Sequence, residues 1–240
     1  MIAAVSMVID HTAMALAVVI PRGSAAYFAM RALGRIAAPL FFWMLVQGYH
    51  HTSDIRKYML RLIVFAFVSE IPFNMAARGT IRYAGHQNIL FTMAIGLAAL
   101  WAADAVSRKL RDPARERPGA VSSGAGRAAF TAAAEWVLRI SIYAAAGLLA
   151  WVLKTDYKFW GIALIVVFSL IKRYNDWRWG GFAAALILVL QGWLEMFALA
   201  ALPLLYLNTG ERGRLGRARW FYLVYPGHLL LLGLLRMFVF

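Results

Sequence analysis

Residues 56–77 read RKYMLRLIVFAFVSEIPFNMAA, and much of the chain is built on the same plan. Basic residues stand at the start of the stretch, and the mostly apolar run after them is close to the roughly 20 residues that an α-helix needs to cross a bilayer. The second half nevertheless contains Glu70, Pro72 and Asn74. Ionisable groups are rare inside transmembrane helices, so the stretch predicts a membrane-crossing helix that carries a polar patch.

The composition extends this interpretation to the whole chain. Of 240 residues, 62% are hydrophobic and 15% are charged, and the mean hydropathy is +0.66, whereas an ordinary soluble domain is about half apolar and a quarter charged. The absence of cysteine excludes a thiol nucleophile and a thiolate metal site. We therefore expect an all-α, polytopic helical bundle, with residues 1–240 forming a single transmembrane domain. The predicted spans are residues 2–20, 28–50, 56–77, 88–106, 134–153, 159–173, 180–191, 193–207 and 219–239.

The number of spans is eight or nine, because residues 180–207 could form one helix or two. Cytoplasmic loops of membrane proteins collect Lys and Arg. Nine spans with a cytoplasmic N-terminus place 16 Lys and Arg on the inner side and 5 on the outer side. A single helix over residues 180–207 would move the basic cluster at residues 212–219 to the outside. The charge distribution therefore favours nine spans in the inner (cytoplasmic) membrane.

The net charge of +14 would suggest a nucleic-acid partner if the protein were soluble. Here most of the basic residues are explained by topology, so nucleic acid is not an expected partner. The longest hydrophilic segment, residues 107–127, is rich in Pro, Gly, Ser and charge. Such a composition predicts a mobile loop on the cytoplasmic side.

Several ionisable groups lie inside the predicted spans, where each costs about 2.5–3.5 kcal/mol on insertion scales. At 1.5 Å per residue, Arg35 and Glu70 lie roughly 5–6 Å to the outer side of their helix centres, and His11 and His228 lie near theirs. These groups share one slab between the midplane and the outer leaflet, as a site entered from outside requires. Structural roles stay open: a buried Arg35–Glu70 ion pair, an interhelical hydrogen bond of His11, and packing for His228.

The polar residues fit group transfer better than other chemistry. A buried histidine beside a carboxylate, as in Asp10–His11, is a common general base. Motifs of serine hydrolases, zinc proteases and P-loop ATPases are absent, and no metal is expected. His11 would remove a proton from an amine or hydroxyl, while Arg or Asn stabilises the oxyanion. On the inner side, Arg56, Lys57 and the segment NTGERGRLGRAR (208–219) could hold phosphates, although topology explains the same charges.

Nine motifs of this chain together resemble the TraX family, the membrane acetylases named for N-acetylation of F-pilin. They are SMVIDH (6–11), LGRIAAPLF (33–41), VQGYHHT (46–52), KYMLRL (57–62), SEIPFN (69–74), HQNILFT (86–92), TDYKFWG (155–161), ALPLLYLNTGERG (201–213) and FYLVYPGHL (221–229). The motifs follow one another over nearly the whole chain. Two departures are Lys158, where the family has glycine, and the segment YLNTG (206–210), where the family has a shorter YNG.

The resemblance implies an acetyl group taken from cytoplasmic acetyl-CoA and an acceptor met on the far side of the membrane. Residues and resemblance together predict a transmembrane acetyltransferase whose acceptor is an amine, such as a pilin or peptide N-terminus. The alternatives are a transporter or channel that uses the same polar slab, and O- or N-acetylation of a sugar or small molecule. Membrane lipids, acetyl-CoA and a peptide or glycan acceptor are the expected partners, and a homo-oligomer is compatible with the sequence.

Each predicted site residue has an expected role. In the catalytic group, Arg35 and Glu70 would pair to shape the pocket, and Asp10 would set the tautomer or solvation of His11. The predicted catalytic residues are His11, Asp10, Arg35 and Glu70. The predicted acceptor-binding residues are Asn74, His86, Gln87, Asn88, Tyr157, Tyr225 and His228. The predicted CoA-binding residues are Arg56, Lys57, Asn208, Gly210 and Arg212.

Overall fold

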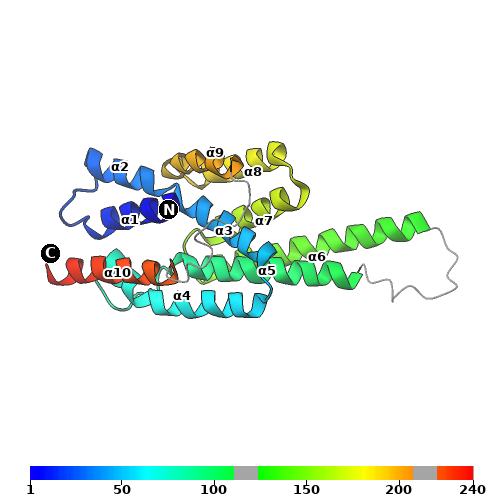
Figure 1. The fold of residues 1–240 in the computed structure, drawn as a ribbon, viewed down its shortest axis with the longest axis horizontal. Helices are drawn as coiled ribbons and strands as arrows, with labels where there is room; N and C mark the ends of the chain where they lie inside the picture. The colour runs from blue at the N-terminus through cyan, green and yellow to red at the C-terminus, as the bar shows by residue number, and fades with distance from the viewer. Residues whose placement is uncertain (111–123, 208–220, 240) are drawn as a thin grey trace.

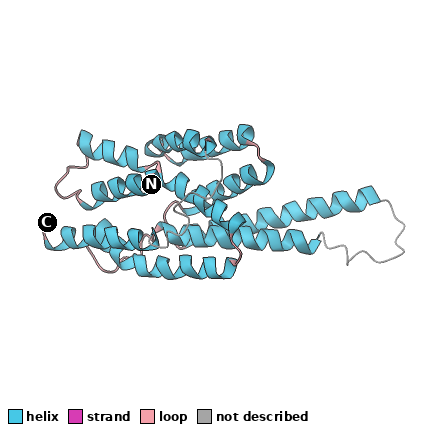
Figure 2. Ribbon diagram, in the orientation of Figure 1, coloured by secondary structure: helices cyan, strands magenta, loops and turns pink. Residues whose placement is uncertain are grey.

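The computed structural model describes residues 1–110, 124–207 and 221–239, and this part of the chain is helical almost throughout (Figures 1 and 2). The described residues contain no strand and one isolated β-bridge, between Gln87 and Thr155. The all-α fold class is therefore confirmed. The helices are α1 (Ile2–Ala15), α2 (Ala25–Gly34), α3 (Ala37–His51), α4 (Ile55–Arg78), α5 (Ile89–Leu110), α6 (Gly124–Val152), α7 (Lys158–Tyr174), α8 (Trp177–Gln191), the 3₁₀ helix η2 (Trp193–Ala200), α9 (Ala201–Tyr206) and α10 (Phe221–Phe238).

Four described segments are long and apolar enough to cross a membrane: Ala25–His51, Ile55–Arg78, Ile89–Leu110 and Ala129–Val152. Shorter apolar helices cover Ile2–Ala15, Trp193–Tyr206 and Tyr222–Phe238. Large apolar side chains also face outward, for example Phe67 at 66% and Phe182 at 63% exposure. Lipid tails solvate such side chains as well as a protein core does. The chain is thus a helical membrane protein, while the nine crossings and the cytoplasmic N-terminus stay predictions.

The predicted span 28–50 lies within one apolar segment, Ala25–His51, but its helix is interrupted. The helix breaks between Gly34 and Ala37, because Pro39 has no N–H and its ring collides with the carbonyl four residues earlier, that of Arg35. The Arg35 N–H still donates to the carbonyls of Arg31 and Ala32, both at 3.2 Å, and so completes the last turn of α2. Arg35 therefore stands at the junction of α2 and α3.

Other predicted span and loop boundaries also differ from the helix boundaries in the structure. The predicted span 2–20 is shorter as a helix, because α1 ends at Ala15 and Pro21 disfavours helical geometry just before it. The predicted loop 107–127 is too long at both ends, since α5 continues to Leu110 and α6 begins at Gly124. The remainder of that loop, residues 111–123, lies outside the described residues.

The segment 180–207 is interrupted, as the charge distribution favoured. Gly192 ends α8 with φ +151°, a conformation that other residues rarely adopt. After this turn, η2 packs back on α8 and also contacts α2 (Figure 1). The reversal brings residues 193–200 to the part of the bundle that holds Arg35.

Helix α1 lies among helices from both ends of the chain. It packs on α2 and α3 and also contacts α4 and α10, while α10 packs along α4 (Figure 1). The approach of α2 to α1 depends on Gly34: a Cβ atom there would lie 2.3 Å from Asp10 Oδ1. Only glycine permits this distance. The polar residues of α1 are therefore held against α2 on one side and α10 on the other.

Candidate functional site

Two histidines from opposite ends of the sequence form the first element of the site. His11 Nδ1 lies 2.7 Å from His228 Nε2, and the nearly parallel rings have centroids 5.0 Å apart. His228 Nδ1 lies 2.6 Å from the Val224 carbonyl, to which it can only donate a proton. His228 Nε2 is then an acceptor, so His11 Nδ1 must donate to it. This chain of hydrogen bonds leaves His11 Nε2 with a lone pair, as a general base needs.

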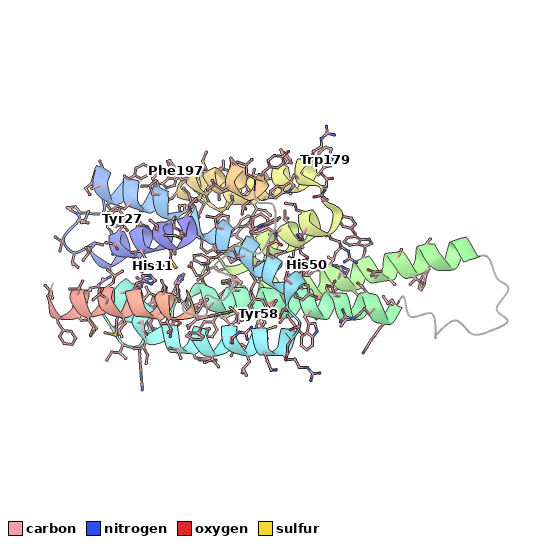
Figure 3. All side chains as sticks on the ribbon, viewed as in Figure 1. His11, Tyr27, His50, Tyr58, Trp179 and Phe197 are labelled. Carbon is pink, nitrogen blue, oxygen red and sulfur yellow. The ribbon has the colours of Figure 1, made fainter. Side chains whose placement is uncertain are left out.

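A small cavity lies next to this histidine pair. It has a volume of about 40 Å³. Its wall contains His11, Asp10, Arg35, Tyr157 and Tyr225, together with Met7, Gly34, Ala37, Ala38, Phe41, Ile89 and Asp156. The Tyr225 ring packs edge-on against both histidines, with centroids 5.9 Å from each. His11, which Figure 3 labels on α1, thus lines one cavity with Tyr225 of α10 and with Arg35 and Tyr157 from the middle of the chain.

A buried cluster of four charged side chains adjoins the same cavity. Asp10 accepts hydrogen bonds from Arg31 Nη1 at 2.7 Å and from Arg35 Nη2 at 2.5 Å. Arg35 Nη1 donates to Glu195 Oε1 at 2.7 Å, and the Tyr157 hydroxyl donates to Glu195 Oε2 at 3.3 Å. All four charged side chains are at most 20% exposed. Two cations and two anions make the cluster neutral, as burial in an apolar bundle requires.

Two predicted roles are wrong in this region. Arg35 pairs with Asp10 and Glu195, not with Glu70, because the break before α3 directs it to α1 and η2. The hydrogen bonds of the Asp10 carboxylate run to the two arginines, while His11 takes its partner from α10. Asp10 therefore does not orient the His11 ring. Glu195 was missed, although a carboxylate within the apolar segment 193–207 was a signal of the same kind as Glu70.

Glu70, Asn74 and Asn88 form a separate junction between α4 and α5. Asn88 Nδ2 donates to Glu70 Oε2 at 2.7 Å and to the Ala66 carbonyl at 2.8 Å, and Asn88 Oδ1 accepts the Leu90 N–H at 3.1 Å. Asn74 Nδ2 donates to Glu70 Oε1 at 3.3 Å. Asn74 and Asn88 are at most 3% exposed. These two residues hold the start of α5 against α4, and neither of them lines the His11 cavity.

The loop before α5 and the turn before α7 interlock at the cavity. Gln87 N–H donates to the Lys154 carbonyl at 3.0 Å, and Asp156 N–H donates to the Gln87 carbonyl at 2.9 Å. The Thr92 hydroxyl donates to the Asp156 carbonyl. The turn is tight, with positive φ at Lys154, Tyr157 and Lys158. Glycine adopts such angles without strain, which gives a physical reason for the glycine expected at position 158.

Asp156 was missed in the sequence, although it lies within the motif TDYKFWG. It lines the cavity beside His11, and its Oδ1 lies 3.5 Å from His86 Nε2. Burial raises the pKa of the Asp156 carboxyl, but the hydrogen bond and charge of His86 and the charge of Arg35 outweigh burial and lower this pKa below its usual value. An ionised carboxylate is therefore present where the loop before α5 and the turn before α7 meet the cavity. The His86 ring also stacks on Phe73, which fixes its position.

The predicted CoA-binding residues are only partly described. Arg56 and Lys57 are exposed at the start of α4, where Asp54 caps the helix by accepting the Lys57 N–H at 3.0 Å. That hydrogen bond lowers the pKa of Asp54. Asn208, Gly210 and Arg212 lie outside the described residues. Within the described ranges, no three His, Asp or Glu side chains converge as metal ligands.

The fold and the site define a class: a polytopic helical membrane protein with a histidine pair and a neutral charge cluster inside its apolar bundle. The chain belongs to the TraX family, because the sequence model described as TraX protein matches residues 1–236. The chain is also 32% identical over 106 residues to the probable fimbrial assembly protein FimC, serogroup H1, of Dichelobacter nodosus. That alignment covers 41% of this chain and 42% of the relative. No solved structure matches the chain.

Proposed function

We propose that this protein is an acetyltransferase of the inner membrane, which transfers acetyl from cytoplasmic acetyl-CoA to an amine on the outer side. The observation that carries the proposal is the hydrogen-bond chain from Val224 through His228 to His11, which leaves His11 Nε2 as a base in a residue that lines a small cavity. The relative named for fimbrial assembly supports a pilin as the acceptor.

The chemistry follows from the groups around the cavity. The acceptor nitrogen attacks the thioester carbonyl, and His11 Nε2 takes a proton from that nitrogen as the C–N bond forms. The positive charge of Arg35, in a low-dielectric site, stabilises the oxyanion of the tetrahedral intermediate. The C–S bond then breaks, and the His11 imidazolium returns the proton to the CoA thiolate. His228 Nε2 accepts the hydrogen bond from His11 Nδ1–H throughout, so His11 Nε2 keeps its lone pair for the reaction.

The size of the cavity supports acetyl as the transferred group. Its volume of about 40 Å³ is little more than the roughly 30 Å³ that a water molecule takes up in the liquid. A two-carbon acyl group fits such a space with small shifts of Met7 and Phe41. A long acyl chain at the same position requires the surrounding helices to move.

The test of the proposal is acceptor-dependent release of CoA. Protein in lipid nanodiscs receives acetyl-CoA and a synthetic peptide with a free N-terminus, and free CoA is measured with a thiol reagent. The chain contains no cysteine, so the protein itself does not react with the thiol reagent. We expect thiol release with the free peptide and none with the same peptide already acetylated. Absence of release with peptide and amino-sugar acceptors alike would overturn the proposal.

Asp156 is the group proposed to bind the acceptor amine. Asp156 lines the His11 cavity beside His86, where an ammonium group would bind and release one proton to water before the neutral amine attacks the thioester. Hydrogen bonds to charged groups contribute about 1.5–3 kcal/mol, so Asp156→Asn should lower kcat/KM for the peptide by roughly 10- to 100-fold. The loss should appear in KM for the peptide and leave KM for acetyl-CoA unchanged.

The matched control for this variant is Asp54→Asn, because asparagine still caps α4 and Asp54 lies away from the cavity. The pH dependence supplies a second measurement. Since the pKa of Asp156 is lowered, the contact is present above the usual carboxyl range and is lost only as pH falls through the lowered value. Wild-type KM for the peptide should therefore show no Asp156 titration between about pH 5 and 8. An unchanged KM in Asp156→Asn would remove Asp156 from acceptor binding.

A further inference from the structure

A second, larger chamber leads away from the candidate site. Its volume is about 270 Å³, and it lies among α1, α3, α4, α5 and α10. It shares Met7, Phe41, Ile89 and Tyr225 with the wall of the His11 cavity. The two spaces are therefore neighbours separated by a few side chains, and a ligand in the chamber has one end beside His11.

The chamber has a mostly apolar wall with polar tips at both ends. Methionines at 1, 7, 44 and 93 contribute to it, and methionine adapts its shape to a ligand more readily than other apolar residues. Tyr225 stands at the His11 end, and Tyr58 and Tyr222 stand in the first turns of α4 and α10. Such a wall fits a flexible ligand that is largely hydrocarbon but carries a few amide groups.

Basic residues frame the end of the chamber that is remote from His11. The Arg61 guanidinium lies 6.0 Å from the centre of the Tyr58 ring. Arg56 and Lys57 are exposed on the turn that precedes Tyr58. The first turns of α4 therefore combine residues of the chamber wall, Tyr58 and Leu62, with neighbouring positive charges, which is complementary to a ligand with an anionic head and an apolar arm.

We propose that this chamber holds the pantetheine arm of acetyl-CoA, with the thioester at the Met7–Tyr225 end and the phosphates at Arg56, Lys57 and Arg61. This assignment rests on the proposed function and adds the path by which the donor reaches His11. The arm is a flexible chain with two amides, and the CoA phosphates supply the anionic head. A lipid chain would match the apolar wall but would not account for a boundary shared with the His11 cavity.

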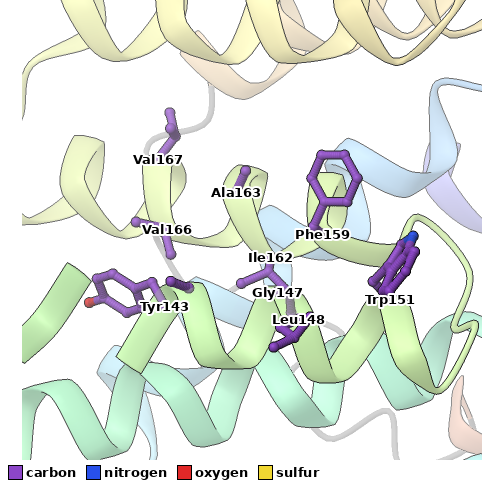
Figure 4. A pocket seen from close by; sticks show the side chains of 10 residues that line it. Tyr143, Gly147, Leu148, Trp151, Phe159, Ile162, Ala163, Val166 and Val167 are labelled. Carbon is purple, nitrogen blue, oxygen red and sulfur yellow. The ribbon is translucent and has the colours of Figure 1, made fainter. Parts of the chain in front are cut away.

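Another cavity serves as the comparison. A groove of about 590 Å³ between α6 and α7 is lined by residues such as Gly147, Trp151, Phe159 and Ala163 (Figure 4). Trp151 is 56% exposed, and the lining is apolar apart from the Tyr143 hydroxyl and the Trp151 indole N–H. It shares no lining residue with the His11 cavity. This groove provides a site where lipid, but not CoA, is expected.

The decisive experiment uses the absence of native cysteine. Met7 lies one helical turn before His11, on the boundary of the two cavities. In the variant Met7→Cys, the thiolate attacks the disulfide of oxidised CoA, a protein–CoA mixed disulfide forms, and one CoA thiolate leaves. Intact-mass measurement in nanodiscs should show the adduct forming at least about tenfold faster than in Ala163→Cys, which presents the same thiol in the α6–α7 groove, as expected for a reaction driven by binding.

Each outcome of this experiment has one meaning. If wild-type protein binds CoA by calorimetry but Met7→Cys reacts no faster than Ala163→Cys, the assignment of the chamber is wrong and the proposed function stands. If wild-type protein binds no CoA and releases no thiol from acetyl-CoA, the proposed function itself fails.

A second variant fills the chamber. Ala4 lines it, whereas Val5 on another face of α1 is 55% exposed. Ala4→Phe should weaken CoA binding about tenfold or more, because an added aromatic ring overpacks the space, and Val5→Phe should leave binding unchanged. Loss of a co-purified lipid with unchanged CoA affinity in Ala4→Phe would overturn the proposal. If Ala4→Phe does not fold, the rate of mixed-disulfide formation in Met7→Cys tests the assignment of the chamber.

Discussion

Substitution of His11 by glutamine should lower acetyl transfer by about 10²- to 10⁴-fold, the contribution that a positioned general base makes. Glutamine can still donate a hydrogen bond to His228, so the pairing of α1 with α10 is retained, but it has no nitrogen lone pair to accept the acceptor's proton. The rate of CoA release with a peptide acceptor is the measurement. Affinity for CoA, measured by calorimetry, should change little.

Two control variants separate catalysis from packing. In His228→Gln, the side-chain carbonyl can accept the His11 proton and the amide can donate to Val224, so the tautomer of His11 is kept and a much smaller loss is expected. His50→Gln, in the last turn of α3, should leave the rate unchanged. Wild-type turnover in a folded His11→Gln protein would show that His11 is not the base.

The sequence predicts many of the residues that belong to the site, but not which of them form hydrogen bonds and ion pairs with each other. His11, Arg35 and His228 were expected at similar depth, and the structure places them around one region. Depth follows from counting along a helix, which sequence permits. Partner choice depends on how each helix is rotated about its axis and on which helices touch, and these follow from packing of distant segments. For this reason Arg35 was assigned to Glu70 and is found with Asp10 and Glu195.

Pro39 and Gly192 were local signals of the breaks that shape this region. Pro39 predicts a kink by itself, since its ring excludes the carbonyl of Arg35, and it accounts for the interruption of the helix within the span 28–50. The break at Gly192 was anticipated through charge distribution, but the return of η2 onto α2 was not. Because the sequence does not predict the contact between η2 and α2, it does not indicate a partner for Glu195.

Asp156 illustrates a contact that local sequence cannot supply. It sits in a short turn whose position depends on backbone bonds to Gln87, about 70 residues earlier. Neither loop has apolar periodicity, and periodicity is the main signal that sequence gives. His86 and Gln87 were predicted to line the acceptor side, and in the structure they position Asp156.

The largest expected change in stability comes from Asp10→Asn. Asp10, Arg31, Arg35 and Glu195 form a neutral set, and each side chain is at most 20% exposed. Asparagine keeps the volume but removes one negative charge, so two guanidinium groups share one carboxylate in an apolar bundle. Removing one partner of a buried ion pair costs about 3–5 kcal/mol, because a charge is left uncompensated. Unfolding by denaturant in detergent micelles should show a loss of this size.

A second substitution distinguishes lost charge balance from lost packing. Arg31 is the most exposed member of the cluster, at 20%, and Arg35 keeps its bond to Glu195 without it. Arg31→Gln in the Asp10→Asn background restores neutrality, so the double variant should be more stable than Asp10→Asn alone, which is a coupling that a double-mutant cycle measures directly. Equal stability of the single and double variants would mean that charge balance does not hold α1 against α2. The site would then owe its geometry to the close approach of Gly34 and to the His11–His228 pair.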